Sequence, residues 1–343
     1  MQSKPTRYPG PRTKPTIGDV AREAGVSIAT VSRVVNGVAN KASPDTRRAV
    51  MEAVERLGYR PVHAGRSLRM KRSPLTAFLI PDSANLFYAA MADAVAARVQ
   101  EGGSAMILCN TREDPAVQDA YLLEMASHLV NGVALFGAVD SPMLRRVIED
   151  GLPVVFVNRR APDGVAGPYV GIDNERAGRE IAQHFLRQRW LPCGVIHGPL
   201  SSSASRERFA GFRQCLAEAG KPVAPRLVAE AGLTIESGYR AAVQLLDVAA
   251  LPRAVFCGND LIAYGLHRRC AEMGIGVPER LAIFGFDDNP LNEWLAPWLN
   301  TVRVPYDDFG RALARMFERL GARRVPEWPE QTLLPHRLVI RCG

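Results

Sequence analysis

Two patterns of hydrophobic and polar positions divide the chain near residue 74. Before this point, apolar residues recur every three or four positions in short segments, which predicts helices over residues 17–24, 28–36 and 44–57. Beyond it, short apolar runs alternate with longer amphipathic segments, which predicts alternating strands and helices. We expect strands over residues 75–80, 105–108, 133–136, 154–157, 193–196, 254–257 and 281–284. We expect helices over residues 89–101, 116–129, 174–187, 206–219, 237–247, 260–273 and 306–320.

Capping residues delimit the short N-terminal helices. Thr16 can cap the first helix, and Asp19 three positions on gives a pattern that resembles a capping box. Gly25, where that helix ends, suits a left-handed turn. Ser43 begins the third helix ahead of a proline and an acid, and Gly58 ends it. The three helices therefore make one small all-α domain.

The alternation beyond residue 74 predicts an α/β core with doubly wound parallel sheets. Some 270 residues of this pattern exceed one ordinary core, so we expect two lobes. Lobe 1 is expected to hold residues 74–172 and 302–334, and lobe 2 residues 173–301 and 335–343. The full prediction is a disordered basic tail over 1–15, a helical domain over 16–60, a linker over 61–73 and a core over 74–343.

The positive charge of the chain is confined to its first fifth. Residues 1–73 hold 15 Lys and Arg against 5 Asp and Glu, whereas residues 74–343 hold 28 against 30. A basic small domain joined to a near-neutral large one predicts a polyanionic partner for the small domain alone.

A helix, a glycine-containing turn and a second helix within residues 17–36 are the geometry that places the second helix in the major groove of DNA. The outward face of that helix is predicted to carry Ile28, Ala29, Ser32, Arg33 and Asn36. An exposed Ile28 beside Ala29 suits thymine methyl groups, and Arg33 suits guanine. Ser32, Asn36 and Thr30 suit phosphates or the register of the helix. The alternative is a three-helix interaction module with an ordinary polar face.

Residues 19–36, DVAREAGVSIATVSRVVN, resemble the N-terminal signature of the LacI/GalR (lactose-repressor) family of bacterial transcriptional regulators. The resemblance continues through RLGYRP at 56–61 and RSL at 66–68 and reaches LLP at 333–335, so it covers nearly the whole chain. It implies a regulator that contacts double-stranded operator DNA. The DNA-binding residues that we expect are Thr16, Ser27, Ile28, Ala29, Thr30, Ser32, Arg33, Asn36, Arg66 and Leu68.

The resemblance also implies a role for the linker. In the family this segment becomes a hinge helix on the operator, and Leu68 matches a leucine that is wedged between base pairs while basic residues such as Arg66 hold phosphates. Two departures weaken this helix: Val62 replaces a capping Asn and Gly65 replaces an Ala. Glycine costs about 0.5–1 kcal/mol in a helix interior, and a lost cap costs about 1 kcal/mol. We therefore expect a hinge that is disordered without DNA.

The core resembles periplasmic sugar-binding proteins, in which two lobes face a ligand cleft. Ligands of such folds bind at the carboxyl ends of parallel strands, and the predicted strand ends are polar: residues 81–88, 110–114, 137, 158–159, 258–260 and 285–289. The resemblance assigns effector contacts to Arg208, Asp287, Asn259 and Asn158. The strand ends add Asn85, Phe87 and Arg112 as effector-binding candidates.

Several residues near these ends have two interpretations. Phe87, Phe286 and Trp298 either stack on an apolar sugar face or pack in the core. Asp260 and Asp288 either line the cleft or cap the helices that follow them. His197 lies at a strand end, and packing is the favoured interpretation for it.

A mechanism follows from the resemblance. A homodimer would present two recognition helices to a palindromic operator, and a small-molecule effector, expected to be a sugar or sugar derivative, would release it. A co-repressor or a protein partner in place of the inducer remains an alternative. The chain has no heptad extension at its C-terminus, which favours a dimer over a tetramer.

Other classes of protein find little support. The sequence has no dinucleotide, P-loop, serine-hydrolase or zinc-protease motif, its six histidines are isolated, and its six cysteines form no C-x-x-C pair. We therefore expect no enzyme, metal or cofactor, and free thiols in a reducing compartment. A secreted sugar-transport protein is disfavoured because no signal peptide or membrane-length apolar run is present. The expected location is the bacterial cytoplasm, in association with the nucleoid.

Overall fold

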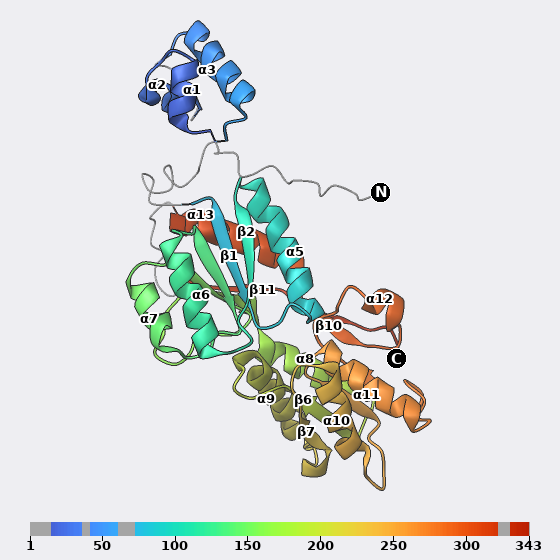
Figure 1. Cartoon of the computed structure of the whole chain (residues 1–343). Coiled ribbons are helices and arrows are strands. Elements are labelled where there is room, and N and C mark those ends of the chain that lie inside the picture. The colour runs from blue at the N-terminus through green and yellow to red at the C-terminus, as the bar shows by residue number, and fades with distance from the viewer. Residues whose placement is uncertain (1–14, 36–41, 61–72, 322–329, 343) are drawn as a thin grey trace, which may run out of the picture. The chain divides into compact units, whose positions relative to one another are not determined.

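The computed structural model describes residues 15–35, 42–60, 73–321 and 330–342. Contacts within the chain group into two compact units that divide between residues 71 and 72 (Figure 1). The predicted hinge, with Arg66 and Leu68, lies outside the described residues, as do the predicted basic tail before residue 15 and Asn36.

The first unit is a three-helix module made of α1 (Ile17–Glu23), α2 (Ile28–Val35) and α3 (Pro44–Leu57). The predicted caps are confirmed: the Thr16 hydroxyl accepts from the backbone N–H of Asp19 in a capping box. Gly25 has the predicted left-handed conformation, with φ 65°, and Gly58 at the end of α3 has φ 62°. The small core consists of Val20, Ala21, Val31, Val50, Ala53 and Tyr59.

The second unit contains two parallel sheets and a short antiparallel pair, which confirms the predicted doubly wound α/β class. The six-stranded sheet has the order β11-β5-β4-β3-β1-β2, the four-stranded sheet β7-β6-β8-β9, and β10 pairs with β12. The strands of the larger sheet are β1 (Leu75–Ile80), β2 (Ala105–Asn110), β3 (Gly132–Phe136), β4 (Val154–Val157), β5 (Tyr169–Ile172) and β11 (Gln331–Leu334). The others are β6 (Cys193–His197), β7 (Val228–Glu230), β8 (Ala254–Cys257), β9 (Ala282–Phe284), β10 (Thr301–Arg303) and β12 (Arg337–Val339).

Helices cover both faces of each parallel sheet. Along β1, Phe78 and Ile80 join the apolar cluster that includes α5 and α13, whereas Ala77 and Leu79 join the cluster that includes α6 and α7. This alternation follows from the two-residue period of a strand, and burial on both faces explains the continuous apolar run. The helices of this unit are α5 (Leu86–Glu101), α6 (Pro115–Ser127), α7 (Pro142–Glu149), α8 (Asn174–Arg187), α9 (Ser203–Glu218), α10 (Ile235–Leu246), α11 (Asp260–Glu272), α12 (Asn292–Leu295) and α13 (Tyr306–Gly321).

The chain crosses between the two sheet layers three times. It leaves the larger sheet after β5 to form α8, returns through β10 to α13, and leaves again after β11 to form β12. The short pair β10-β12 therefore consists of two crossing segments, and Figure 1 shows it beside α12. We call the six-stranded sheet with its helices lobe 1 and the four-stranded sheet with its helices lobe 2. The residue bounds predicted for the two lobes stay a prediction.

Several element bounds differ from the sequence prediction. Helix α5 begins at residue 86 rather than 89 because Asn85 caps it, and α9 begins at 203 rather than 206 because Ser202 caps it. The strands β5, β7, β10, β11 and β12 were not predicted, since each has three or four residues and lacks a long apolar run. No helix among the described residues is long and apolar enough to cross a membrane.

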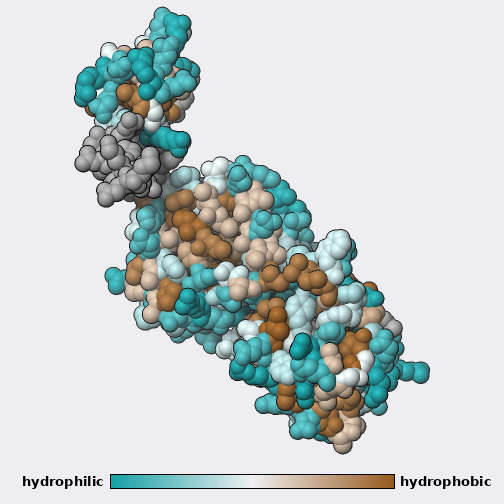
Figure 2. All heavy atoms as spheres, turned by 45° about the vertical axis from the view of Figure 1, so that its right-hand side comes forward, coloured by the Kyte–Doolittle hydropathy of each residue, from teal (hydrophilic) through white to brown (hydrophobic). Residues whose placement is uncertain are grey.

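Large apolar side chains are exposed on part of the second unit. Trp294 and Leu295 of α12 are 79% and 71% exposed, and the neighbouring Leu291 is 42% exposed. Figure 2, which turns the side of α5 and α12 toward the viewer, shows apolar residues at the surface on that face. Large contiguous apolar patches on folded proteins are typical of interaction surfaces.

Candidate functional site

The outward face of α2 carries most of the predicted DNA-binding residues. Ile28 is 55% exposed and Ala29 and Arg33 are exposed, whereas Val31 points inward and is fully buried. The structure thus places an apolar pair and a guanidinium on one solvent-facing surface. Arg33 is exposed and forms no ion pair with another described residue.

Side-chain hydrogen bonds cap the N-terminus of α2. The Ser27 hydroxyl accepts from the backbone N–H of Thr30 at 3.1 Å, and the two hydroxyl oxygens are 2.9 Å apart. Thr16 holds the N-terminus of α1 in the same way. Helix N-termini carry partial positive charge and free N–H groups, which suits phosphate. Ser32 is half-buried beside them.

The second unit contains a cleft between its two lobes with two adjoining cavities. The outer cavity has a volume of about 530 Å³, and Pro81, Asp82, Asn85, Tyr88, Asn110, Arg112, Glu113, Leu233 and Thr234 line it. Around the smaller inner cavity lie Asn85, Phe87, Tyr88, Asn158, Arg159, Ser202, Ala204, Ser205, Arg208, Leu233, Asn259 and Asp287. Most of these residues follow the carboxyl ends of strands, where ligands of open α/β sheets bind.

A buried charge pair, Arg208 and Asp287, lines the inner cavity. The guanidinium of Arg208 lies 3.8 Å from Asp287, and it donates to Asn174 at 2.7 Å and to the Gly258 carbonyl at 3.0 Å. Its carbon lies 3.5 Å from the centre of the Phe286 ring. Burial lowers the pKa of Arg208, and burial raises the pKa of Asp287 well above its ordinary value although Arg208 opposes that shift. The pair is therefore only partly satisfied, and polar ligand groups can complete it.

A second pair and a tyrosine lie between the two cavities. Arg159 is buried and donates to Glu113 at 2.8 Å. Burial raises the pKa of Tyr88 to about 12, so its hydroxyl stays protonated. That hydroxyl forms no hydrogen bond with any described residue, and Tyr88 is only 4% exposed. A phenol O–H without a partner next to a cavity is a natural contact for a ligand hydroxyl.

Strained backbone is concentrated at the cleft. Of the described non-glycine residues with positive φ, Arg112 (56°), Glu113 (55°), Asn158 (64°) and Asp287 (109°) line its cavities. Asp288 (50°) directly follows. Such conformations cost roughly 1–3 kcal/mol each and persist only where the surrounding structure imposes them. The backbone around the cleft is therefore held in conformations that are unfavourable for residues with a side chain.

All seven predicted effector-binding residues lie around this cleft. Six of them line the inner cavity, Asn85, Phe87, Asn158, Arg208, Asn259 and Asp287, and Arg112 lines the outer one. Asn85 and Asn259 also cap helices, since their side-chain oxygens accept from the backbone N–H groups of Phe87 and Ile262. Their NH2 groups are the parts left for a ligand. Their roles in binding stay a prediction.

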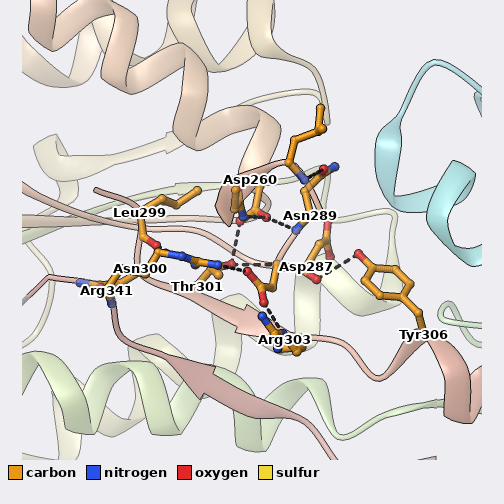
Figure 3. A network of polar contacts seen from close by, with 12 residues as sticks. Asp260, Asp287, Asn289, Leu299, Asn300, Thr301, Arg303, Tyr306 and Arg341 are labelled. Carbon is orange, nitrogen blue, oxygen red and sulfur yellow. Dashed lines mark hydrogen bonds and ion pairs between the residues drawn. The ribbon is translucent and has the colours of Figure 1, made fainter. Parts of the chain in front are cut away.

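Other sequence interpretations are resolved by the packing. Phe286 is fully buried beneath Arg208, and Trp298 stacks on His267 with ring centres 3.9 Å apart, so neither lines a cavity. The idea that Asp260 and Asp288 cap helices is wrong, because Asn259 caps α11 and no side chain caps α12, the helix that follows Asp288. Asp260 belongs instead to a polar network shown in Figure 3, and Asp288 pairs with Arg303 and Arg341, which the figure labels. His197 is buried and stacks on Phe209, as favoured from the sequence.

Sequence reasoning missed several residues of the cleft. Ser202 and Ser205 precede Arg208 at three-residue intervals, a helical spacing that places all three on one face, so this signal was present. Leu233 and Thr234 follow the unpredicted strand β7, and no sequence pattern indicated them. Tyr88 was noted only as part of a strand end.

Two family models match the chain. Residues 16–62 match "Bacterial regulatory proteins, lacI family", and residues 182–342 match "Periplasmic binding protein-like domain". The HTH-type transcriptional regulator DegA of Bacillus subtilis (strain 168) is 34% identical over 335 residues, which are 96% of this chain and 97% of DegA.

Solved structures agree with this match. The transcriptional regulator CelR–cellobiose complex has a TM-score of 0.71 and 31% identity and covers 95% of this chain and 98% of its own. The lac repressor dimer bound to operator and the anti-inducer ONPF has a TM-score of 0.85 and 25% identity, with 96% and 98% covered. The expected resemblance is confirmed, and the chain belongs to the lacI family of bacterial regulatory proteins.

Proposed function

We propose that the protein is a transcriptional repressor that binds a palindromic operator as a homodimer and is released when a sugar or sugar derivative occupies the cleft. The observation that carries the proposal is the cleft itself, in which a buried, incompletely paired Arg208 and Asp287 meet amide and hydroxyl donors. We propose that the protein acts in the bacterial cytoplasm, where it binds DNA. It performs no catalysis, in keeping with relatives that are transcription regulators.

The charges of the cleft favour a neutral ligand. Arg159 is paired with Glu113 and Arg208 with Asp287, and Arg112 in the outer cavity lies in the same lining as Asp82. The cleft thus offers donors and acceptors in balance, as a polyhydroxylated molecule requires, rather than an excess of one charge. A relative of known structure, CelR, forms a complex with cellobiose.

The DNA-binding surface is proposed to be the outward face of α2. Arg33 would donate two hydrogen bonds to a guanine, and Ile28 with Ala29 would contact thymine methyl groups. Ser27 and Thr30, at the helix N-terminus, would hold a phosphate together with Thr16 and Ser32. Asn36, Arg66 and Leu68 complete the proposed contacts from the family resemblance.

The dimer is proposed to involve the exposed apolar surface at α12. Trp294 and Leu295 are 79% and 71% exposed, so burial of these side chains in an interface would be favourable. We expect Trp294→Asp to give a monomer by light scattering and to weaken operator binding about a hundredfold, because two linked half-sites no longer act together. Glu293→Gln on the same short helix is the matched control. A dimeric Trp294→Asp variant would contradict this assignment.

The experiment for the whole proposal is selection of DNA from a pool of random duplexes, followed by a titration with sugars. We expect one palindrome to be enriched, and we expect cellobiose or ribose, each tested at millimolar concentration, to release it. Enrichment of a palindrome that no sugar releases would keep the DNA-binding part and overturn the ligand class. No enrichment with or without sugars would overturn the proposal.

A further inference from the structure

A charged cluster at the crossing segments includes Asp288, which directly follows the cleft residue Asp287. The carboxylate of Asp288 is 1% exposed; it accepts from Arg341 at 2.7 Å and from the guanidinium of Arg303. We call these three residues the clasp. Arg303 belongs to β10 and Arg341 follows β12, so the clasp joins the loop after β9 to two segments that run between the lobes. Figure 3 labels the two arginines.

The loop that the clasp holds is strained and carries a cleft residue. Asp287 and Asp288 have φ angles of 109° and 50°, which only surrounding contacts can impose on residues with a side chain. The backbone N–H of Asp287 donates to the Val302 carbonyl at 3.0 Å, and the Tyr306 hydroxyl donates to the Asp287 carbonyl at 3.0 Å. The Asp287 carboxylate is thereby held toward Arg208.

Asp260 fixes the far side of the same loop. Its carboxylate accepts from the backbone N–H of Asn289 at 2.9 Å, from the Asn292 side chain at 2.7 Å and from the Thr301 hydroxyl at 2.7 Å. The loop is therefore restrained on both sides of Asp287, by Asp260 and by the clasp.

The C-terminal segment does not need Asp288 for its own anchorage. Asn300 is fully buried; it accepts from the backbone N–H groups of Arg341 and Cys342 and donates to the Cys342 carbonyl. The Arg341 guanidinium also donates to the Leu299 carbonyl at 3.0 Å. With the segment already held by these bonds, the contact of Arg341 with Asp288 restrains the loop rather than the segment.

We propose that Arg341, together with Arg303, is a positioning residue for effector binding, which through Asp288 holds Asp287 in the geometry that meets the ligand. The proposal rests on the proposed function of the cleft. It assigns a role in ligand recognition to a residue beyond the last strand, 53 positions from Asp288. It also means that the strained loop and the crossing segments move together, so a change in lobe arrangement changes the ligand site.

The test uses the full-length protein and four variants. Arg341→Met removes the charge and keeps much of the side-chain volume, and Arg341→Lys keeps the charge but loses the planar fork. Arg337→Met is the control, since Arg337 is an exposed arginine on the adjoining strand β12. Asp288→Asn removes the charge from the other side. Hydrogen exchange of peptides is measured without ligand, and binding of cellobiose and ribose is measured by calorimetry.

We expect faster exchange of residues 285–292 in Arg341→Met and Asp288→Asn, with residues 75–80 of β1 unchanged. Binding of whichever sugar binds the wild type should weaken about tenfold or more, as a lost hydrogen bond between charged groups implies. Arg341→Lys should lie between Arg341→Met and the wild type, and Arg337→Met should behave as the wild type.

Two outcomes would overturn the proposal. One is faster exchange in Arg341→Met confined to residues 299–303 and 337–342, since that is a purely structural role of the C-terminal segment. The other is unchanged sugar binding in Arg341→Met. If neither sugar binds the wild type, the ligand class proposed for the cleft fails, and the exchange of residues 285–292 still decides whether the clasp positions the loop. An Arg341→Met variant that does not fold leaves Arg341→Lys and Asp288→Asn to give the same comparison.

Discussion

The three-helix module and the cleft of the core place their functional groups in opposite environments. On α2, the proposed contacts Ile28 and Arg33 stand on the surface, and the fold beneath them depends on other residues such as Val20 and Val31. In the core, Arg208 and Asp287 are 5% and 7% exposed and are held by strained loops and polar networks. Function and folding are therefore separable in the module and joined in the cleft.

The largest expected effect is that of Arg208→Met. It leaves Asp287 as a buried charge without its partner, which costs about 3–5 kcal/mol of stability where one member of a buried pair is removed. We expect a lower melting temperature of the core and loss of detectable binding of the sugar, measured by calorimetry, with operator binding retained. Arg208→Met combined with Asp287→Asn should recover part of the stability and none of the sugar binding.

A contradiction would be full sugar binding in Arg208→Met. A control is Arg206→Met, two positions earlier on α9, where the exposed guanidinium donates to the Leu200 carbonyl. That variant should retain sugar binding.

A smaller effect is expected for Arg33→Ala, which should weaken operator binding and leave stability nearly unchanged. Arg33 is exposed and forms no ion pair with another described residue. Its removal should therefore change the free energy of unfolding by no more than about 0.5 kcal/mol. Operator affinity should fall by about 1–3 kcal/mol, and preference at one base position should relax. Fluorescence anisotropy with the selected operator and its single-base variants measures both. An equal loss on every sequence would instead assign Arg33 to a phosphate.

The last expected effect concerns Asp260 and pH. Burial raises the pKa of Asp260 from 3.8 to about 6. Because the native pKa is the higher one, the native state binds a proton more readily, so this group's contribution to stability is lost as the pH rises from about 4 through about 6. Urea titrations of the wild type and Asp260→Asn should give a stability difference that changes across this window and is constant above it. A difference that is constant throughout would contradict the shift.

The sequence predicted the module better than the cleft, and the physical reason is locality. Caps such as Thr16 and Ser43 act within three residues, so the bounds of α1 and α3 could be derived directly. Strand ends of the core could be found because buried parallel strands are continuous apolar runs. The family resemblance then identified Arg208, Asp287, Asn259 and Asn158, but not the polar contacts that hold them in place.

Contacts between distant segments were beyond sequence reasoning. The pairing of Asp288 with Arg303 and Arg341, and the pairing of Arg159 with Glu113, join residues that only the folded chain brings together. Short strands such as β10 and β12 carry too few residues for a period to be recognised. The helix-capping interpretation of Asp260 failed for this reason, because the groups that it binds come from the loop after β9 and from β10.

The central claim is that occupation of the cleft decides whether α2 stays on DNA. The most direct test titrates cellobiose and ribose into a preformed complex of the labelled operator with wild type or with Arg208→Met, followed by fluorescence anisotropy. The account predicts that one sugar releases the wild type, while Arg208→Met binds the operator equally well and is not released. Equal release of both proteins, or sugar binding in the cleft that leaves operator affinity unchanged, would contradict it.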